Sequence, residues 1–248
     1  MGWADSIATQ RPLVFAHRGA SARYLENTLP AFIEAIALGV DGIELDVQCA
    51  RDGIVVVYHD FDLTRFTRSH AKIANLDSPT LIAAALRPPD TLHLAEVEYR
   101  IPLLREVLEL CRGKVHVDIE LKGDDPRLPA AVIEVVRATA MAEQVTCTSF
   151  NADFLTELSM RAPDLATGYL IALDEQWISL VAHPSQGACV PKWLLTPERA
   201  DELRSAGKWI LVWTLDDREE IELALHSDPD AIVSNHPERV LAVREDQS

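Results

Sequence analysis

The chain has 248 residues, of which 48% are hydrophobic and 25% are charged, and this balance is typical of a globular protein with a sizeable core. Its formal net charge of −16 disfavours nucleic acid and anionic lipid as partners, and no run of lysine or arginine reverses that charge locally. The sequence shows no secretory signal and no apolar stretch of about 20 residues, so we expect a cytoplasmic protein without stable membrane association.

Eight strand-like runs recur along the chain, with helix-like segments between them. They span residues 13–17, 42–49, 115–121, 145–150, 167–172, 188–190, 209–215 and 231–234. Strands that alternate with helices predict right-handed βαβ units and a parallel sheet. Eight such units in a chain of this length predict an α/β fold of the (β/α)8 TIM-barrel type, formed by residues 1–248 as a single domain.

A ninth strand-like run, residues 54–58, follows the second run after only four residues. A parallel crossover needs about a dozen residues or more, so this run must return antiparallel as a β-hairpin. If Cys49 pairs with Ile54, His59 lies opposite Glu44. Residues 61–101 contain three prolines and little periodicity, and we expect them to form a lid or a small insertion on the barrel.

Carboxylates interrupt two of the apolar runs. Glu44 and Asp46 are two residues apart on one predicted strand, so both project from one face, toward the barrel axis if the apolar residues between them face the helices. Glu120 on the next barrel strand completes an all-oxygen trio. Such a trio suits Mg²⁺, Ca²⁺ or Mn²⁺ better than zinc. The alternative is that these acids form salt bridges to inward basic residues.

Basic and imidazole side chains stand at or near the ends of the same runs. His17 ends the first run, and the carboxyl ends of barrel strands are where catalytic groups collect. The hairpin would bring His59 to the same end. Arg18 offers a planar fork for phosphate, Gly19 permits close approach of the backbone to a ligand, and Lys122 shares a face with Glu120. Buried charge costs several kcal/mol per ion unless it is compensated, so these groups are expected to converge on one site.

Trp213, on the seventh predicted run, fits either of two roles. It is an ordinary core residue or a wall for an apolar or glycerol moiety of a substrate. An anionic substrate gains nothing from the overall field of so acidic a chain, so its attraction must be local. Arg18, Lys122 or a bound cation would supply it.

Six stretches between residues 13 and 237 carry a resemblance to a known family. They are HRGASARYLENT from His17, GIELDVQCARDGIVVVYHD ending at Asp60, IPLLREVLEL from Ile101, VDIELK ending at Lys122, TSF ending at Phe150 and VWT ending at Thr214. In their order and spacing the sequence resembles the glycerophosphodiester phosphodiesterase family. That resemblance implies a (β/α)8 barrel related to phosphatidylinositol-specific phospholipases.

The resemblance also implies roles for individual residues. It implies a metal held by Glu44, Asp46 and Glu120, and the oxygen ligands make Mg²⁺ or Ca²⁺ the first candidates and Mn²⁺ a further one. It implies acid/base chemistry by His17 and His59, and contacts to the substrate phosphate from Arg18 and Lys122. Trp213 is a further substrate-binding candidate because of its place on the seventh predicted run.

The sequence departs from the family pattern at three positions near these motifs. Leu25 stands where proline is usual, Asp216 replaces a frequent asparagine, and Asn235 replaces a frequent aspartate. The metal and histidine positions are intact. Because of these departures, the resemblance does not define the pocket for the alcohol group or identify the natural substrate.

The expected reaction is metal-dependent hydrolysis of a glycerophosphodiester to sn-glycerol 3-phosphate and an alcohol, by acid/base catalysis with two histidines. The nucleophile is either water or the 2-hydroxyl of the substrate, and neither histidine is assigned as acid or base. One alternative is a lysophospholipase D, which would need a large exposed apolar patch beside the strand ends. Two others are a barrel that binds phosphoesters without cleaving them and a metal-dependent sugar-phosphate isomerase or aldolase. The expected partner is a small molecule, and no oligomeric state is predicted.

Overall fold

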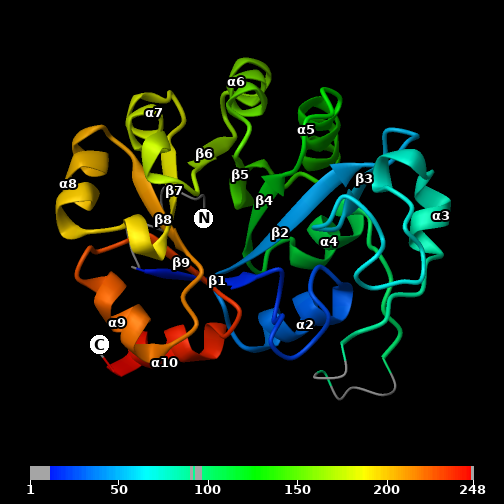
Figure 1. Cartoon of the computed structure of the whole chain (residues 1–248), viewed down its shortest axis with the longest axis horizontal. Helices are drawn as coiled ribbons and strands as arrows, with labels where there is room; N and C mark the ends of the chain where they lie inside the picture. The colour runs from blue at the N-terminus through cyan, green and yellow to red at the C-terminus, as the bar shows by residue number, and fades with distance from the viewer. Residues whose placement is uncertain (1–11, 90–91, 93–96, 247–248) are drawn as a thin grey trace.

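A closed parallel barrel of eight strands forms the centre of the molecule (Figure 1). The structure is a computed structural model, and it describes residues 12–89, 92 and 97–246. The first strand pairs with both the second and the last, which closes the sheet and confirms the predicted TIM barrel. Its strands are β1 (Leu13–His17), β2 (Gly42–Cys49), β4 (His116–Leu121), β5 (Val145–Ser149), β6 (Ala166–Leu170), β7 (Gly187–Pro191), β8 (Trp209–Trp213) and β9 (Ala231–Ser234).

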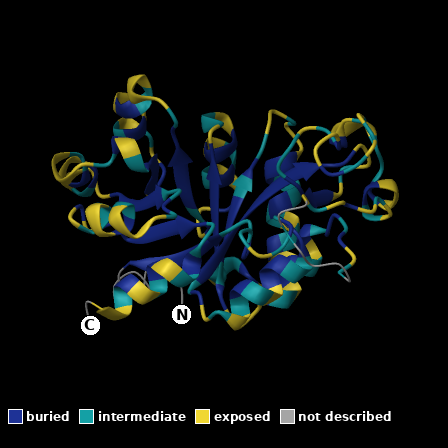
Figure 2. Ribbon diagram, turned by 60° about the horizontal axis from the view of Figure 1, so that its bottom comes forward, coloured by how far each residue is buried: buried dark blue, intermediate teal, exposed yellow. Residues whose placement is uncertain are grey.

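Helices surround the barrel, and the largest part of the core lies between the two layers. Outward-facing Ile43, Leu45 and Val47 of β2 belong to one buried cluster with Phe32 and Leu108 of the helices. Figure 2 shows buried strands inside and exposed residues on the outer helix faces and loops. The helices are α2 (Leu29–Ala37), α4 (Leu104–Cys111), α5 (Leu128–Ala138), α6 (Ala152–Arg161), α7 (Trp177–Ala182), α8 (Pro197–Ser205), α9 (Arg218–Leu225) and α10 (Pro237–Asp246), with the 3₁₀ turns η2 (Ala142–Gln144), η3 (Asp174–Gln176) and η4 (Lys192–Leu194).

The strand β3 (Val55–Val57) returns antiparallel to β2, as the short connection predicted. The predicted register is wrong by one residue, because Cys49 pairs with Val55 and not with Ile54. The Ala50 N–H donates to the Ile54 carbonyl, so the turn contains only three residues and has Gly53 at φ 83°. Three-residue hairpin turns favour a glycine in this left-handed conformation. His59 therefore does not pair across the hairpin with Glu44.

The segment between the hairpin and α4 builds a small core of its own. Among its described residues it contains η1 (Ile73–Asn75) and α3 (Ser78–Ile82), seen beside β3 in Figure 1. Leu63, Phe66 and Tyr99 form a buried cluster with Val56 of the hairpin, separate from the main core. In the described part of the chain, no helix has both the length and the apolar character that a membrane crossing requires.

Candidate active site

Three carboxylates converge at the carboxyl end of the barrel. Glu44 and Asp46 point inward from β2, and Glu120 of β4 is the register partner of Asp46. Each residue offers one oxygen, and the three oxygens lie within 4.8 Å of one another. The alternating side chains of β2 explain this placement, since Ile43 and Leu45 face the helices. An all-oxygen cluster of this size is compatible with a divalent cation.

Two cations compensate this cluster only in part. The Arg18 Nε atom lies 3.1 Å from Asp46 Oδ2, and the Lys122 Nζ atom lies 2.8 Å from Glu120 Oε1 and 3.5 Å from Asp46 Oδ1. Burial alone would raise the pKa of Asp46, but Arg18 and Lys122, together with His59 and the hydrogen bond from Asn27, lower it. For the other two acids the balance is reversed. Burial and the charge of Asp46 raise the pKa of Glu120 to about 7 and that of Glu44 well above its usual value.

A fourth carboxyl group, which the sequence analysis missed, lies on β4 two residues before Glu120 and level with Glu44. Asp118 is the register partner of Glu44, lines the same cavity and is only 2% exposed. Burial raises its pKa to about 8 in spite of a hydrogen bond with Thr148. The signal was present in the sequence, because Asp118 is two residues from Glu120 and must share its face. The four carboxyl groups of this site thus outnumber the two cationic side chains, Arg18 and Lys122, that lie among them.

The imidazole of His17 lies between Glu44 and a residue from the far end of the chain. Its Nε2 atom is 3.8 Å from Glu44 Oε2, and its Nδ1 atom is 2.7 Å from Asn235 Oδ1. Burial, and next the positive charge of Arg18, lower the pKa of His17. A neutral imidazole is therefore favoured at this position.

The turn after His17 has an unusual backbone conformation. Arg18 has φ 56° and Gly19 has φ 83°, and the Arg18 N–H donates to Glu44 Oε2 at 3.0 Å. A Cβ atom on Gly19 would lie 2.8 Å from the carbonyl carbon of Ala31. The close backbone approach that this glycine permits in the structure is to helix α2. Left-handed non-glycine residues such as Arg18 are concentrated at functional sites.

A chain of charged contacts connects the second histidine to Arg18. The Nδ1 atom of His59 is 2.7 Å from Asp60 Oδ1, and Arg65 Nε donates to Asp60 Oδ2 at 2.6 Å. Arg65 also donates to Glu26, which in turn accepts a hydrogen bond from Arg18 Nη1 at 2.8 Å. From the sequence, Glu26 fits either a loop role or a direct catalytic role, and Arg65 does not stand out. Their separation along the chain gave no signal of this contact.

Asn27 supports the carboxylate cluster from the same loop. Its Nδ2 group donates to Asp46 Oδ2 at 2.7 Å, and the Asp46 N–H donates to Asn27 Oδ1 at 3.2 Å. Asn27 is 2% exposed and has φ 57°. From the sequence, Asn27 fits either a helix N-cap or a direct catalytic role, and in the structure its side chain contacts the carboxylate cluster.

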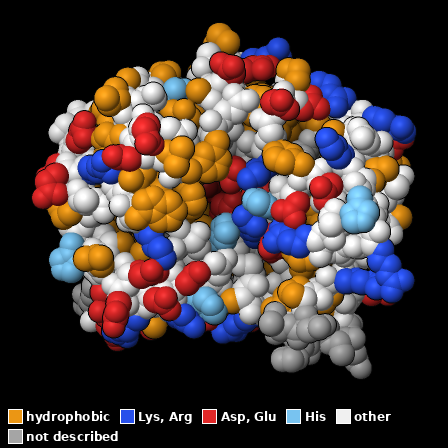
Figure 3. Space-filling view, viewed as in Figure 1, with side chains coloured by type: hydrophobic (Ala, Val, Ile, Leu, Met, Phe, Trp, Pro, Cys, Tyr) orange, Lys and Arg blue, Asp and Glu red, His pale blue; other side chains and the backbone are white. Residues whose placement is uncertain are grey.

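One cavity of about 340 Å³ is lined by both histidines and both cations. Glu44, Glu120 and Asp118 lie on its polar side, and Leu170, Leu211 and Val233 lie on its apolar side. Figure 3 shows this hollow with acidic, basic and histidine side chains, bordered by hydrophobic ones. The cavity is smaller than many ligand sites and suits a small polar substrate.

Aromatic side chains border the mouth of this cavity. Trp213, which lines it, contacts Phe150 and Trp193 edge to face, with ring centroids 6.0 and 6.3 Å apart. Trp193 is 63% exposed and Phe61 is 58% exposed. A neighbouring hollow of about 460 Å³ is lined by Phe61, Phe150 and Lys122. We call these four aromatic residues the aromatic rim.

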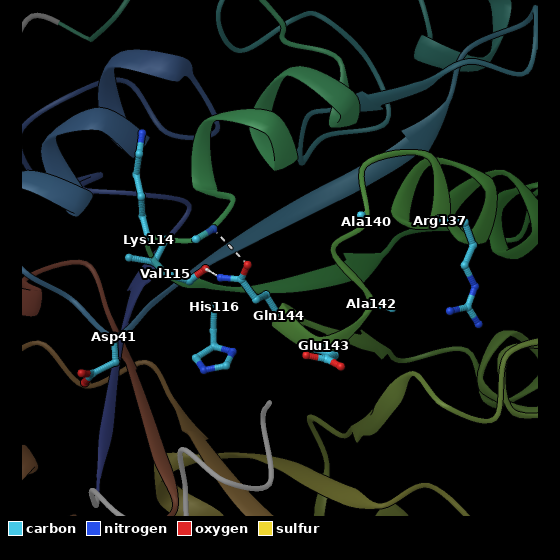
Figure 4. A pocket seen from close by; sticks show the side chains of 10 residues that line it. Asp41, Lys114, Val115, His116, Arg137, Ala140, Ala142, Glu143 and Gln144 are labelled. Carbon is cyan, nitrogen blue, oxygen red and sulfur yellow. Dashed lines mark hydrogen bonds between the residues drawn. The ribbon is translucent and has the colours of Figure 1, made fainter. Parts of the chain in front are cut away.

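A larger cavity of about 610 Å³ lies at the opposite end of the barrel (Figure 4). Val115 and Gln144, which line it, immediately precede β4 and β5, and the Gln144 side chain bridges Gly113 and Val115 by hydrogen bonds. None of the candidate residues lines this cavity. The active sites of TIM-barrel enzymes lie at the carboxyl ends of the strands, so we place the candidate active site in the smaller cavity.

Over most of its length the chain is similar to known proteins. The model of the glycerophosphoryl diester phosphodiesterase family matches residues 17–239. A glycerophosphodiester phosphodiesterase from Caldanaerobacter subterraneus subsp. tengcongensis is 31% identical over 239 residues, which cover 93% of this chain and 97% of that protein. The crystal structure of a glycerophosphodiester phosphodiesterase from Agrobacterium tumefaciens matches with a TM-score of 0.80 and 28% identity, covering 93% of this chain and 99% of that one.

A further solved structure is that of a phosphodiesterase from Oleispira antarctica in complex with the product sn-glycerol-3-phosphate. It matches with a TM-score of 0.85 and 24% identity, covering 94% of this chain and 97% of that one. At that identity the likeness concerns the barrel fold.

Proposed function

The chain belongs to the glycerophosphoryl diester phosphodiesterase family, and on that basis we propose that it hydrolyses glycerophosphodiesters to sn-glycerol 3-phosphate and an alcohol by metal-dependent catalysis with two histidines. The family is one of enzymes, so the alternatives of a non-catalytic barrel and of an isomerase or aldolase are set aside. The observation that carries the proposal is one small cavity lined by two imidazoles, two cations and an acidic cluster.

The donor set of the cavity fits a hard divalent cation. Glu44, Asp46 and Glu120 supply only oxygen. Burial and the neighbouring charge of Asp46 raise the pKa of Glu44 and Glu120, and a bound cation would offset both effects. These three residues would hold the ion. Once bound, such an ion would neutralise charge on the phosphoryl oxygens of the substrate.

The basic residues would bind the phosphate. Arg18 uses Nη1 and Nε in its contacts with Glu26 and Asp46, and a guanidinium has five N–H donors, so donors remain for a phosphate oxygen. The Lys122 ammonium has three donors and lies at the edge of the same cavity. Hydrogen bonds from charged donors to phosphate are stronger than those between neutral groups.

The two histidines would move the protons. His17 and His59 line the cavity from β1 and from the segment after β3. One imidazole removes a proton from the attacking hydroxyl, and the other donates a proton to the leaving oxygen. A glycerol phosphate would then be released, and sn-glycerol-3-phosphate is the product bound in the phosphodiesterase from Oleispira antarctica.

A product assay with controlled metal tests this proposal. The protein is stripped with a chelator and supplied with glycerophosphocholine, glycerophosphoethanolamine or glycerophosphoinositol, and sn-glycerol 3-phosphate is measured with a coupled dehydrogenase. We expect no product without metal and recovery with Mg²⁺, Ca²⁺ or Mn²⁺. Undiminished turnover in metal-free protein would contradict metal dependence, and absence of product with every substrate and cation would contradict the reaction itself.

The aromatic rim favours a second candidate, a lysophospholipase D activity. Phe61 and Trp193 expose more than half of their area beside the cavity, and an acyl chain would cover such apolar surface whereas a glycerol headgroup would not. A relative from Rattus norvegicus, 26% identical, is named lysophospholipase D. The phosphodiesterase and lysophospholipase D activities are distinguished by kinetics with glycerophosphocholine and with lysophosphatidylcholine, measured below the critical micelle concentration. A higher kcat/KM for the lysolipid that falls in Phe61→Ser supports the second candidate.

A further inference from the structure

Asn235 and Asp216 form a hydrogen-bonded pair beside His17. Asn235 directly follows β9, and Asp216 follows β8 by three residues. The Asp216 Oδ2 atom accepts from Asn235 Nδ2 at 2.7 Å, and its Oδ1 atom accepts from the Asn235 backbone N–H at 2.8 Å and from Ser234 Oγ at 3.2 Å. A carboxylate accepts hydrogen bonds and does not donate them, so the amide NH₂ of Asn235 must face Asp216.

The orientation of that amide determines which nitrogen of His17 carries hydrogen. With its NH₂ group on Asp216, Asn235 presents Oδ1 to His17 Nδ1 at 2.7 Å and to Ser21 Oγ at 3.0 Å. A carbonyl oxygen only accepts, so the Nδ1 atom of His17 must be the donor. In a neutral imidazole the other nitrogen, Nε2, then holds the free lone pair, and it lies on the Glu44 side of the ring.

We propose that Asn235, oriented by Asp216, is a positioning residue that keeps hydrogen on Nδ1 of His17 and directs its Nε2 atom into the cavity. This role rests on the proposed function, in which His17 exchanges a proton with the substrate. Neither Asn235 nor Asp216 lines the cavity, so both act through His17. In free solution an imidazole samples both tautomers and turns about its side-chain bonds, and the pair removes that freedom.

The tautomer is measured directly by NMR, without reference to turnover. Two-bond ¹H–¹⁵N correlations of the histidine rings distinguish the nitrogen that carries hydrogen, and His17→Gln identifies the signal. In metal-free wild-type protein at about pH 8 we expect hydrogen on Nδ1 of His17, and in Asn235→Ala we expect a mixture of tautomers. Hydrogen on Nε2 in the wild-type protein would overturn the proposal.

Kinetics of exchanged pairs test the functional consequence. Asn235→Ala should lower kcat at least about ten-fold and change KM less than about three-fold, as expected when an orienting partner is lost. Asn235→Asp alone sets two carboxylates against each other and should also lose at least about ten-fold in kcat. The double variant D216N/N235D restores one carboxylate and one amide, and it should recover kcat to within about three-fold of wild type.

Ser21→Ala is the matched control. It removes the other donor to Asn235 Oδ1 but leaves the acceptor for His17, so kcat should stay within about two-fold of wild type. If Asn235→Ala does not fold by circular dichroism, Asp216→Asn carries the same test, because its amide no longer dictates which end of Asn235 faces His17. Wild-type kcat in folded Asn235→Ala, or a double variant no faster than Asn235→Asp, would overturn the proposal. A wild-type protein without phosphodiesterase activity would contradict the proposed function. The NMR measurement of the His17 tautomer does not depend on turnover and would still test this proposal.

Discussion

Replacement of Asp118 by asparagine should stabilise the metal-free protein at neutral pH. The side chain is 2% exposed, and burial raises its pKa from 3.8 to about 8. Between these two values the folded protein retains a proton that the unfolded chain has lost. Because the folded state binds more protons, the free energy of unfolding falls as the pH rises through this window. Asparagine has nearly the same shape and no proton to lose, so the variant lacks this fall.

The size of the effect follows from the width of the window. Each pKa unit corresponds to about 1.4 kcal/mol, so a window of about four units bounds the effect at about 5 to 6 kcal/mol above pH 8. Relaxation of the cavity and entry of water reduce this bound. We therefore expect Asp118→Asn to raise the free energy of unfolding by about 2 to 4 kcal/mol at pH 7.5 and by about 1 kcal/mol at pH 5. For a chain of this size the former corresponds to roughly 5 to 15 °C in Tm.

Urea unfolding followed by tryptophan fluorescence, in chelator and at both pH values, measures this difference. Asp164→Asn is the matched control, because that carboxylate is half exposed in a surface pair with Arg137 and should change the free energy of unfolding by less than about 1 kcal/mol. An Asp118→Asn variant whose advantage over wild type does not grow between pH 5 and pH 7.5 would refute the assigned burial effect.

Three further predictions concern the proposed chemistry. Mg²⁺ or Ca²⁺ should raise the Tm of the metal-free protein, and Asp46→Asn should abolish that rise; an unchanged rise would place the ion elsewhere. His17→Ala and His59→Ala should each lower kcat by about 10²–10⁴-fold without loss of secondary structure, and near-normal kcat in either variant would remove that histidine from the mechanism. Lys122→Met should lower kcat/KM by about 10- to 100-fold, the value of a charged hydrogen bond to phosphate, whereas Lys114→Met at the opposite end should leave it unchanged.

The sequence predicted the barrel because its signals are local. Each strand is recognisable as a short run rich in β-branched residues. The number of residues between two consecutive strands then distinguishes a parallel crossover from a hairpin. Strand alternation places Glu44 and Asp46 on one face, and the apolar residues that flank them predict that this face points inward, as the structure confirms. The predicted hairpin register was wrong because the register depends on the conformation of one turn residue, Gly53. The number of residues in the connection does not reveal that conformation.

The residues around the histidines could not be found in this way. Asp216 and Asn235 each stood out only as a separate departure from the family pattern, and the structure shows that the two side chains are in contact. Relative to the family pattern these two positions exchange a carboxylate and an amide, and in this structure a hydrogen bond joins them. Glu26 and Arg65 are 39 positions apart and meet only because the hairpin folds back onto the first loop. Contacts of this kind depend on tertiary geometry, which local pattern does not encode.

Closure of the barrel sets both contacts of the His17 imidazole. On one side of β1, His17 is the register partner of Glu44, and on the other side Ala16 is the register partner of Ser234, the residue before Asn235. The imidazole therefore meets Glu44 and Asn235 at once, although Asn235 is 218 positions away in the sequence. A shift of β1 by one residue would turn this side chain to the opposite face of the sheet. The most distant strand pairing of the fold is thus the one that places this histidine, and the proposed chemistry requires the complete barrel.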